Sequence, residues 1–301
     1  MRAAAVRPAL AAHPGALGDV LLAIPALRAL RATSGGVTLA AQRHVADLVV
    51  ALGEADHARA FESLRLDTLF AGDGTADLPH ADRVVCWFGA RDADFIRRLR
   101  GQAPGAVVAP SVGPGLVWEH LLATTGAPAG AWRAPARVDP GLVAAGGAAL
   151  AAAGWDGHRR VLLVQPGASA ATKRWPAEGF AAALAGLAAR EDVALVLHEG
   201  PNDREAVEAL TARLPAALRL REPALPALAG ALRRAAAYLG NDCGVSHLAA
   251  TVGTPAVVLF VPANLAWRPW AVEPQVVKVG TSRVESTDVA AVRAAIERRL
   301  G

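Results

Sequence analysis

Short apolar runs alternate with longer stretches of helical spacing along the chain. In the first half the apolar runs end at Gly or Pro, and the stretch 21–33 (LLAIPALRALRAT) repeats its apolar residues at the period of a helix. The runs that we predict as strands in this half cover 9–13, 36–41, 83–88 and 106–112. Strands made almost entirely of apolar residues are buried on both faces, which is typical of parallel sheets covered by helices.

The second half repeats this alternation. Its predicted strands cover 159–167, 193–200, 235–242 and 256–262, and its predicted helices cover 180–190, 204–214, 245–252 and 287–300. Between the halves, the segment 126–141 is rich in Pro, Gly and Ala and has no clear period, so it is the best candidate for a linker. The pattern therefore predicts an α/β protein with two doubly wound parallel-sheet units.

One stretch of the second half has a composition that raises a different possibility. From Cys243 to Trp267 the chain has 25 residues without Asp, Glu, Lys or Arg, which is long enough to cross a bilayer. Gly253 and Pro255 interrupt it, and both residues disfavour a continuous helix. We therefore predict a buried helix followed by a buried strand instead of a membrane span.

The charge of the chain argues against a nucleic-acid partner. The 301 residues are 53% hydrophobic and 19% charged, with a net charge of +4. All but two of the 31 basic residues are arginines, no four basic residues are consecutive, and the chain has a single Tyr. A surface that binds nucleic acid usually combines clustered basic residues with aromatic side chains. Phosphate-bearing small molecules, or an acceptor at a membrane surface, remain compatible with this balance.

The cysteines and histidines do not form a metal-binding pattern. Cys86 and Cys243 are the only cysteines, and no Cys/His cluster has the spacing of a zinc site. Two isolated thiols suit a reducing compartment, so we expect a cytoplasmic protein with neither a disulfide nor a bound metal.

Four polar clusters follow predicted strands. They are HPGALGD (13–19), QPGASAATKRWP (165–176), HEGPND (198–203) and GNDCGVSH (240–247). The carboxyl ends of parallel strands lie on one edge of a sheet, where helix N-termini offer free N–H groups to anions. Three of the four clusters lie in the second half, so we expect that half to form most of a nucleotide site.

Each cluster also has a structural explanation. Lys173 follows small residues that let a backbone approach an anion, but the spacing is not that of a Walker loop, so a solvated lysine in a connecting loop is an alternative. Asp19 and Asp242 stand where helices begin and are candidates for N-caps. His247, on an apolar helix, is a candidate for a core histidine.

The pair Asp92 and Asp94 is similar to the metal-binding DxD sequence of many sugar-nucleotide transferases. Acidic residues also favour the first turn of a helix. We therefore interpret these residues as the start of the helix DADFIRRLR.

Taken together, the clusters resemble glycosyltransferase family nine, the heptosyltransferase family. The resemblance covers nearly the whole chain and rests on GALGDVLLAIPALRALR near the start, PGASAATKRWPAEGFAAAL in the middle and GNDCGVSHLAATVGTPAVVLF near the end. It implies the GT-B fold, in which two Rossmann-like domains face each other across a cleft. The implied domains are 1–135 for the acceptor and 136–286 for the nucleotide sugar, with a C-terminal helix, 287–301, that packs back on the first domain.

The resemblance also implies roles for individual residues. Asp19 matches the general base of the family, and Gly15 and Gly18 belong to the loop on the acceptor side. The residues that match the site for the donor diphosphate are Ser169, Thr172, Lys173, Asp242, Cys243, Gly244 and His247. The residues that fall where the family contacts the ribose and the base are Glu199, Asn202 and Asp203.

The implied reaction is the transfer of a sugar, typically heptose from an ADP-linked donor, with inversion. The acceptor would be a saccharide or a lipid-linked saccharide, as in lipopolysaccharide biosynthesis, and no cofactor or metal ion is required. A peripheral contact with the inner membrane is compatible with the basic residues of the first domain, and the oligomeric state is left open.

The chain departs from the family pattern at three places. Cys243 replaces a residue that usually carries a hydroxyl, and a thiol is a weaker hydrogen-bond donor to phosphate. The loop 259–264 reads LFVPAN where LFGPT is common, and the loop 198–203 lacks the usual spacing of its acidic residues. These departures leave two alternatives open: a nucleotide-sugar epimerase or hydrolase with the same fold, and a nucleotide-sugar-binding protein without transferase activity.

Overall fold

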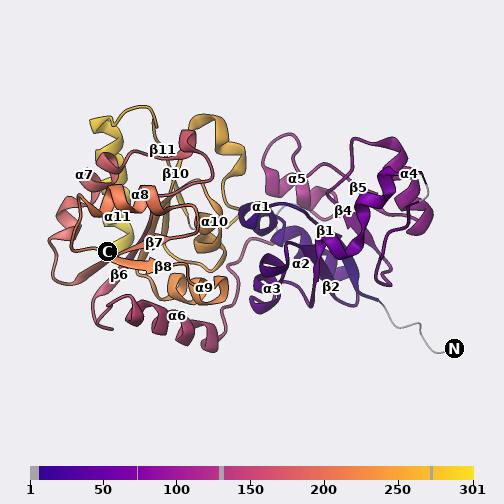
Figure 1. Cartoon of the computed structure of the whole chain (residues 1–301), viewed down its shortest axis with the longest axis horizontal. Coiled ribbons are helices and arrows are strands. Elements are labelled where there is room, and N and C mark those ends of the chain that lie inside the picture. Colours follow the sequence, from indigo (N-terminus) through magenta and orange to yellow (C-terminus); the bar gives the residue numbers. More distant parts are fainter. Residues whose placement is uncertain (1–6, 73, 129–131, 272–273) are drawn as a thin grey trace. The chain divides into compact units, whose positions relative to one another are not determined.

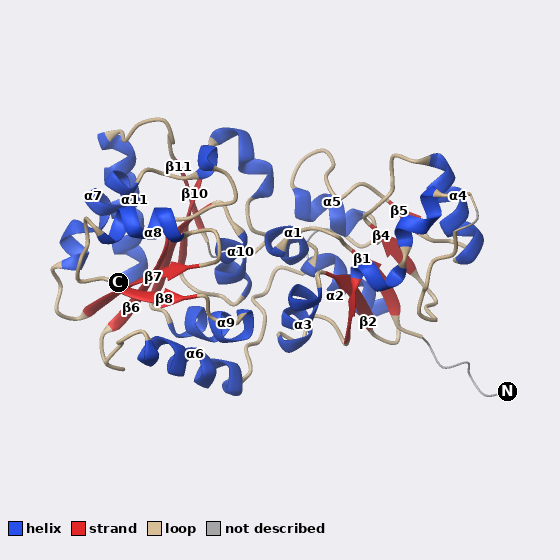
Figure 2. Cartoon of the chain, in the orientation of Figure 1, coloured by secondary structure: helices blue, strands red, loops and turns tan. Residues whose placement is uncertain are grey.

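The chain folds into two units, each with its own parallel sheet (Figures 1 and 2). The computed structural model describes residues 7–72, 74–128, 132–271 and 274–301. Unit 1 covers Met1–Arg133 and unit 2 covers Ala134–Gly301. The boundary lies within the segment 126–141, of which residues 129–131 lie outside the described part of the chain.

Unit 1 is built on a five-stranded sheet of order β3-β2-β1-β4-β5. Its strands are β1 (Ala9–Ala12), β2 (Val37–Ala41), β3 (His57–Ala60), β4 (Val84–Cys86) and β5 (Val107–Val108), and every pairing between them is parallel. Its helices are α1 (Leu17–Leu22), α2 (Ile24–Thr33), α3 (Arg43–Ala51), α4 (Ala93–Gln102) and α5 (Val117–Ala123), and its 3-10 turns are η1 (Phe61–Leu64) and η2 (Leu66–Phe70). β1 and β2 are buried at every position, as their apolar sequences predict.

The first helical segment is divided, unlike the single helix expected over 21–33. α1 ends at Leu22, Ala23 is its C-cap, and α2 begins at Ile24 with Pro25 near its start. A proline inside a helix has no N–H to donate, and its ring clashes with the carbonyl of the preceding turn. The helix therefore ends before Pro25 and a new one begins there.

Unit 2 is built on a six-stranded sheet of order β11-β10-β9-β6-β7-β8. Its strands, again all parallel, are β6 (Arg160–Gln165), β7 (Val193–Glu199), β8 (Leu218–Arg221), β9 (Ala237–Asn241), β10 (Ala256–Phe260) and β11 (Gln275–Lys278). Its helices are α6 (Pro140–Ala152), α7 (Ala177–Ala188), α8 (Arg204–Thr211), α9 (Leu225–Arg234), α10 (Gly244–Thr251) and α11 (Ser286–Leu300), and its 3-10 turns are η3 (Ala171–Lys173) and η4 (Pro262–Trp267).

Helices cover both faces of this sheet (Figure 2). α7, α8 and α11 lie on one face, and α6 and α9 lie on the other. The apolar face of α11, with Val292, Ala295 and Ile296, belongs to the core of unit 2. This face is buried against the sheet and α7 of its own unit.

Seven of the eight predicted strands are confirmed inside the sheets, and the eighth, predicted over 106–112, is reduced to the two-residue edge strand β5. The strands that the pattern did not predict also lie at the edges. β3 (HARA), β8 (LRLR) and β11 (QVVK) are edge strands, and each carries exposed or half-buried residues. An edge strand is buried less than a central one, so its sequence need not be a continuous apolar run. The pattern of apolar residues therefore predicts the central strands but does not predict short edge strands that contain polar residues.

The uncharged stretch 243–267 forms α10, β10 and η4, as expected of a buried helix followed by a buried strand. Leu248 and Ala249 of α10 and all five residues of β10 are buried. Across the described residues of the chain, no helix combines the length and the apolar character needed to span a membrane.

Candidate functional site

The loop after β1 in unit 1 is folded by its own side chains. His13 directly follows the strand, and its Nδ1 accepts a hydrogen bond from the Gly15 N–H at 3.0 Å. Asp19 lies in the first turn of α1, and its Oδ2 accepts from the Ala16 N–H at 3.0 Å. The N-cap of α1 is Ala16, so the prediction that Asp19 is the N-cap is wrong: Asp19 is the third residue of the helix, and its side chain reaches back to the N-cap N–H. Its side chain is half-buried, and its role as a general base stays a prediction.

Gly15 has no room for a side chain. A Cβ at this position would lie 2.6 Å from Cε1 of His13 and 2.6 Å from Cβ of Asp19. Only glycine therefore lets the imidazole and the carboxylate pack on either side of the backbone. Gly18, the other glycine of the predicted acceptor-side loop, lies half-buried in the first turn of α1.

His13 is a functional candidate that the sequence analysis did not single out. Its side chain is buried, and this burial lowers its pKa to about 4 although the Asp19 carboxylate acts in the opposite direction. The imidazole is therefore neutral at pH 7, and its proton is on Nε2 because Nδ1 accepts from Gly15. The only signal in the sequence was its place in the cluster HPGALGD, at the end of a buried strand.

The centre of the unit 2 site is an ion pair between Lys173 and Asp242. Nζ of Lys173 lies 2.9 Å from Oδ2 of Asp242, and Nδ2 of Asn264 donates to the same oxygen at 3.1 Å. Nε2 of His247 lies 3.9 Å from the other carboxylate oxygen. The fold thus brings together three of the predicted diphosphate residues, and it adds Asn264 from the loop 259–264.

Asp242 is ionised in this setting. Its burial acts to raise its pKa, but the contacts with His247 and Lys173 outweigh burial and hold the pKa below its ordinary value. Because Asp242 is buried and the side chain of Lys173 is 29% exposed, the carboxylate presents the ammonium group toward solvent. An ammonium group held in this way is suited to bind an anion.

The loop 166–175, which carries Lys173, is closed at both ends by one buried residue. Asn241, the last residue of β9, donates from Nδ2 to the Pro166 carbonyl at 2.7 Å and accepts at Oδ1 from the Trp175 N–H at 3.0 Å. It is fully buried, so both hydrogen bonds are shielded from water. Asn241 belongs to the polar cluster 240–247, but its sequence context predicts no role for it. Ser169 and Thr172 are exposed on the loop that it closes.

The N-cap residue of α10 is Cys243, not Asp242 as predicted, and its side chain makes no capping hydrogen bond. Burial raises the pKa of its thiol, so the group is protonated at pH 7. Sγ lies 3.7 Å from Oγ of Ser246, which in turn contacts the Tyr238 hydroxyl at 2.8 Å. Gly244 and the N–H groups that follow it begin the helix, whose dipole favours an anion at this end.

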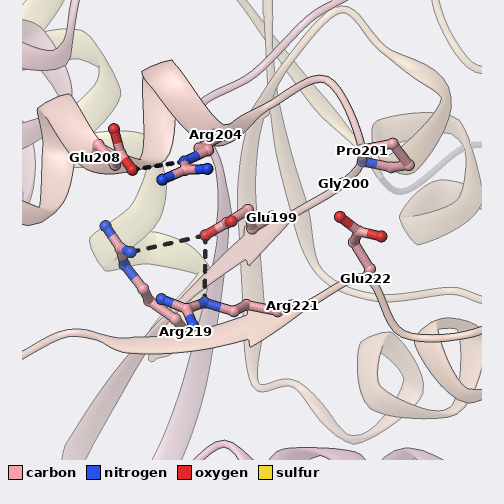
Figure 3. Close-up of a pocket in the computed structure, with 8 residues that line it drawn as sticks. All are labelled: Glu199, Gly200, Pro201, Arg204, Glu208, Arg219, Arg221 and Glu222. Atoms are coloured by element: carbon pink, nitrogen blue, oxygen red, sulfur yellow. Dashed lines mark hydrogen bonds and ion pairs between the residues drawn. The ribbon is translucent and has the colours of Figure 1, made fainter.

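Of the three residues predicted to contact the ribose and the base, only Glu199 lines the pocket at the ends of β7 and β8. Glu199 lies at the end of β7, and the pocket has a volume of about 410 Å³ (Figure 3). The residues that line it with Glu199 are Gly200, Pro201, Arg204, Glu208, Arg219, Arg221 and Glu222. Asn202 is exposed, and neither it nor Asp203 is part of that lining.

Asp203 faces the loop after β6 instead. Its Oδ2 accepts from Nε2 of Gln165 at 2.9 Å and from the Gly200 N–H at 3.1 Å. Since Gln165 donates from Nε2, its Oε1 accepts from Nδ1 of the buried His198 at 2.5 Å. This network joins the ends of β6 and β7 to the start of α8. Burial lowers the pKa of His198 to about 4, so this histidine is also neutral at pH 7.

The pair Asp92 and Asp94 starts a helix, as expected. Asp92 is the N-cap of α4, and its Oδ1 accepts from the Phe95 N–H at 2.7 Å, while Asp94 pairs with Arg97. Within the described part of the chain, no group of three or more His, Cys, Asp and Glu side chains is placed to hold a metal ion.

Comparisons with known proteins agree with this arrangement. The family model described as glycosyltransferase family 9 (heptosyltransferase) matches residues 140–292, which include α6 to β11 and the first half of α11. No curated protein matches the chain.

Solved structures match over nearly the whole chain. E. coli ADP-heptose LPS heptosyltransferase II has a TM-score of 0.74 and 18% identity over 97% of this chain and 98% of that one. A family 9 glycosyltransferase from Veillonella parvula has a TM-score of 0.75 and 17% identity over 98% and 97%. The E. coli heptosyltransferase WaaC with ADP has a TM-score of 0.68 and 16% identity over 97% and 99%. These likenesses show the fold, which is GT-B.

Proposed function

The chain belongs to glycosyltransferase family 9, and from this premise we propose that it is an inverting glycosyltransferase that transfers heptose from ADP-heptose to a saccharide or lipid-linked acceptor. The observation that carries the proposal is the Lys173–Asp242 ion pair, with a distance of 2.9 Å, at the start of α10. It lies in the part of the chain that the family model matches.

The donor diphosphate, in this proposal, binds between the loop 166–175 and the start of α10. Cleavage of the bond between sugar and diphosphate develops negative charge on the leaving group. Lys173 and the N–H groups that begin at Gly244 would stabilise this charge, with Asp242 and His247 holding Lys173 in place. Ser169 and Thr172, exposed on the loop, would add hydroxyl donors, and Cys243 would add only a weak one.

The acceptor would react at unit 1. We assign Asp19 as the general base that removes the proton from the acceptor hydroxyl, with the loop of Gly15 and Gly18 beside it. Attack from the sugar face opposite to the leaving group inverts the anomeric carbon. Burial lowers the pKa of the neighbouring His13 to about 4, so at pH 7 this imidazole is neutral and does not form an ion pair with the carboxylate.

The nucleoside would bind at the ends of β7 and β8. Glu199, which lines the pocket there, is placed to accept hydrogen bonds from the ribose hydroxyls, and the exposed Asn202 is a second candidate. Asp203 would act indirectly, because its carboxylate already joins the loops after β6 and β7. We further propose a cytoplasmic enzyme, with a peripheral membrane contact if the acceptor is lipid-linked.

A transfer assay distinguishes this function from its alternatives. Purified protein is incubated with ADP-heptose in the presence and absence of a saccharide acceptor, and ADP and the sugar products are measured. Release of ADP that requires the acceptor supports a transferase. Release without acceptor indicates a hydrolase, conversion of the donor sugar indicates an epimerase, and binding without turnover indicates a binding protein. Activity should persist in EDTA, because Lys173 and helix N–H groups take the role of a metal ion in this proposal.

Two variants test the assigned roles separately. Lys173→Ala should weaken ADP binding by about 10- to 100-fold, the effect of losing a hydrogen bond to a charged group. Asp19→Asn should leave ADP binding unchanged and lower kcat by roughly 10²- to 10⁴-fold, because asparagine keeps an acceptor for the Ala16 N–H but is not a base. Calorimetry and initial rates give the two numbers. Equal effects of both variants on ADP binding would contradict the assignment.

A further inference from the structure

The pocket at the ends of β7 and β8 contains a residue with an unfavourable backbone conformation. Glu222, directly after β8, has a φ of +40°, and among the described non-glycine residues only Arg65 shares a positive φ, of +51°. L-residues avoid this region because Cβ comes too close to the following carbonyl. The Glu222 N–H donates to the Glu199 carbonyl at 2.8 Å, which holds it beside the end of β7.

The carboxylate of Glu222 differs from the other two carboxylates of the pocket. Glu208 pairs with Arg204 at 2.9 Å. Glu199 has Arg221 and Arg219 at 3.7 and 3.9 Å. The Glu222 carboxylate makes neither an ion pair nor a hydrogen bond with any described residue, and the side chain is exposed to solvent.

The pocket therefore has two chemically different sides. Figure 3 shows the Glu222 carboxylate next to the segment of Gly200 and Pro201, while the guanidinium groups of Arg219 and Arg221 lie on the opposite side, beside Glu199. One side offers hydrogen-bond donors and the other a free, acceptor-only group. A phosphate group would be repelled by Glu222, so this side of the pocket fits a neutral ligand group that carries N–H or O–H donors.

We propose that Glu222 determines the specificity for the nucleobase of the donor, by accepting a hydrogen bond from the exocyclic amino group of an amino-bearing base. This inference rests on the proposed function, in which the donor is a nucleotide sugar and Glu199 binds its ribose. Adenine and cytosine present an amino group where the corresponding edge of a uracil-type base presents a carbonyl oxygen. A carboxylate attracts the first and repels the second, so Glu222 favours ADP over UDP. The unfavourable φ is retained because it places the carboxylate in the pocket.

Calorimetry with the full chain tests this assignment, with ADP, CDP and UDP as the probes. The wild type should bind ADP about tenfold more tightly than UDP, the effect of one hydrogen bond to a charged acceptor. Glu222→Gln keeps the size of the side chain but offers both a donor and an acceptor. It should bring the ratio of the two affinities to within about twofold, with ADP and CDP weakened and UDP strengthened.

A pair of glycine variants separates this role from a structural one. Glu222→Gly removes the carboxylate and relieves the backbone, and Arg65→Gly relieves the same kind of backbone between η1 and η2 of unit 1. Glycine adopts a positive φ without a steric penalty, so both variants should keep the thermal midpoint of the wild type or exceed it. Only Glu222→Gly should lose the preference for ADP.

Two results would overturn the assignment of Glu222. One is an unchanged ratio of ADP to UDP affinity in Glu222→Gln, including an equal weakening of both nucleotides. The other is the same loss of preference in Arg65→Gly. If the wild type binds none of the nucleotides, the proposed function itself fails, and the assignment fails with it. Binding of ADP with selectivity independent of residue 222 removes only the assignment.

Discussion

The loops that follow the first strand of each unit are held in place by different kinds of contact. In unit 1 the loop after β1 is held by side chains only two and three residues from the groups they contact, His13 on Gly15 and Asp19 on Ala16. In unit 2 the loop after β6 is held by Asn241, which lies 75 residues from Pro166 and 66 from Trp175. One loop is organised locally and the other by the fold of its unit.

The difference has a consequence for how each site forms. A short loop that satisfies its own N–H groups needs only its neighbouring helix and strand to be in place. The long loop of Lys173 reaches its geometry only when β9 has paired with β6, because that pairing brings Asn241 to the loop. The proposed donor site therefore depends on the cooperative folding of unit 2, and the proposed base in unit 1 depends on a few adjacent residues.

The largest expected effect on stability comes from replacing Asn241, whose side chain holds both ends of the loop 166–175. Asn241→Leu leaves the buried Pro166 carbonyl and Trp175 N–H without partners, at a cost of about 1–3 kcal/mol for each group. Urea denaturation should show a loss of roughly 2–5 kcal/mol in the free energy of unfolding of unit 2. Asn264→Leu makes the same chemical change at a half-buried position and should cost less than about 1 kcal/mol. Similar losses in both variants would contradict the role of Asn241.

The next largest effect is the pH dependence of stability that arises from one buried histidine in each unit. His13 and His198 have folded-state pKa values of about 4, below the ordinary value of 6.5, so the unfolded chain binds their protons first as the pH falls. Stability is complete above pH 6.5 and decreases toward pH 4, by about 3 kcal/mol for each histidine. The measurement is urea denaturation at pH 7.0 and 4.5, with hydrogen exchange of peptides from each unit reporting unit 1 and unit 2 separately.

Asparagine variants assign this pH dependence to the units. In His13→Asn, Oδ1 can still accept from Gly15, and in His198→Asn, Nδ2 can still donate to Gln165. The first variant should remove the pH dependence of unit 1 and the second that of unit 2. The assignment is wrong if either variant alters the pH dependence of both units equally.

A smaller effect tests the local packing of the unit 1 loop. Gly15→Ala forces a Cβ to within 2.6 Å of both His13 and Asp19, and overpacking of this kind costs about 1–3 kcal/mol. Transfer activity should fall as well, because Asp19 must move. Gly101→Ala is the control, since no atom lies within 4 Å of its Cβ and alanine favours the helix α4. Full activity of Gly15→Ala would show that the position of Asp19 is not critical.

The smallest effect concerns the thiol at the start of α10. Cys243→Ser should stabilise unit 2 by roughly 0.5–1 kcal/mol, because serine is a good N-cap and cysteine makes no capping bond here. The affinity for ADP should change by less than about threefold, since the N–H groups of the helix, not the side chain, supply most of the contact. A large gain in affinity would mean that the thiol limits the donor site.

The sequence predicted where the candidate site residues lie in the fold, but not which side chains contact one another there. All four polar clusters follow central strands, as predicted, because a run of buried apolar residues identifies a strand and the rule for parallel sheets places its carboxyl end. The ion pair between Lys173 and Asp242 joins two of these clusters. No pattern in the sequence indicates that Asn241 closes the loop or that Asp203 turns toward Gln165, because both contacts join residues distant along the chain.

By itself, the sequence determined the α/β class, the central strands, the helix started by Asp92 and the family to which the chain belongs. These features depend on periodicity and on motifs of neighbouring residues, and such information is contained in short stretches. The tertiary structure alone decided which short polar strands complete the sheet edges, how Asn264 joins Asp242, and that Glu222 has a positive φ. The physical reason is that burial leaves a periodic trace in the sequence, whereas a contact between distant side chains exists only once the sheet has brought them together.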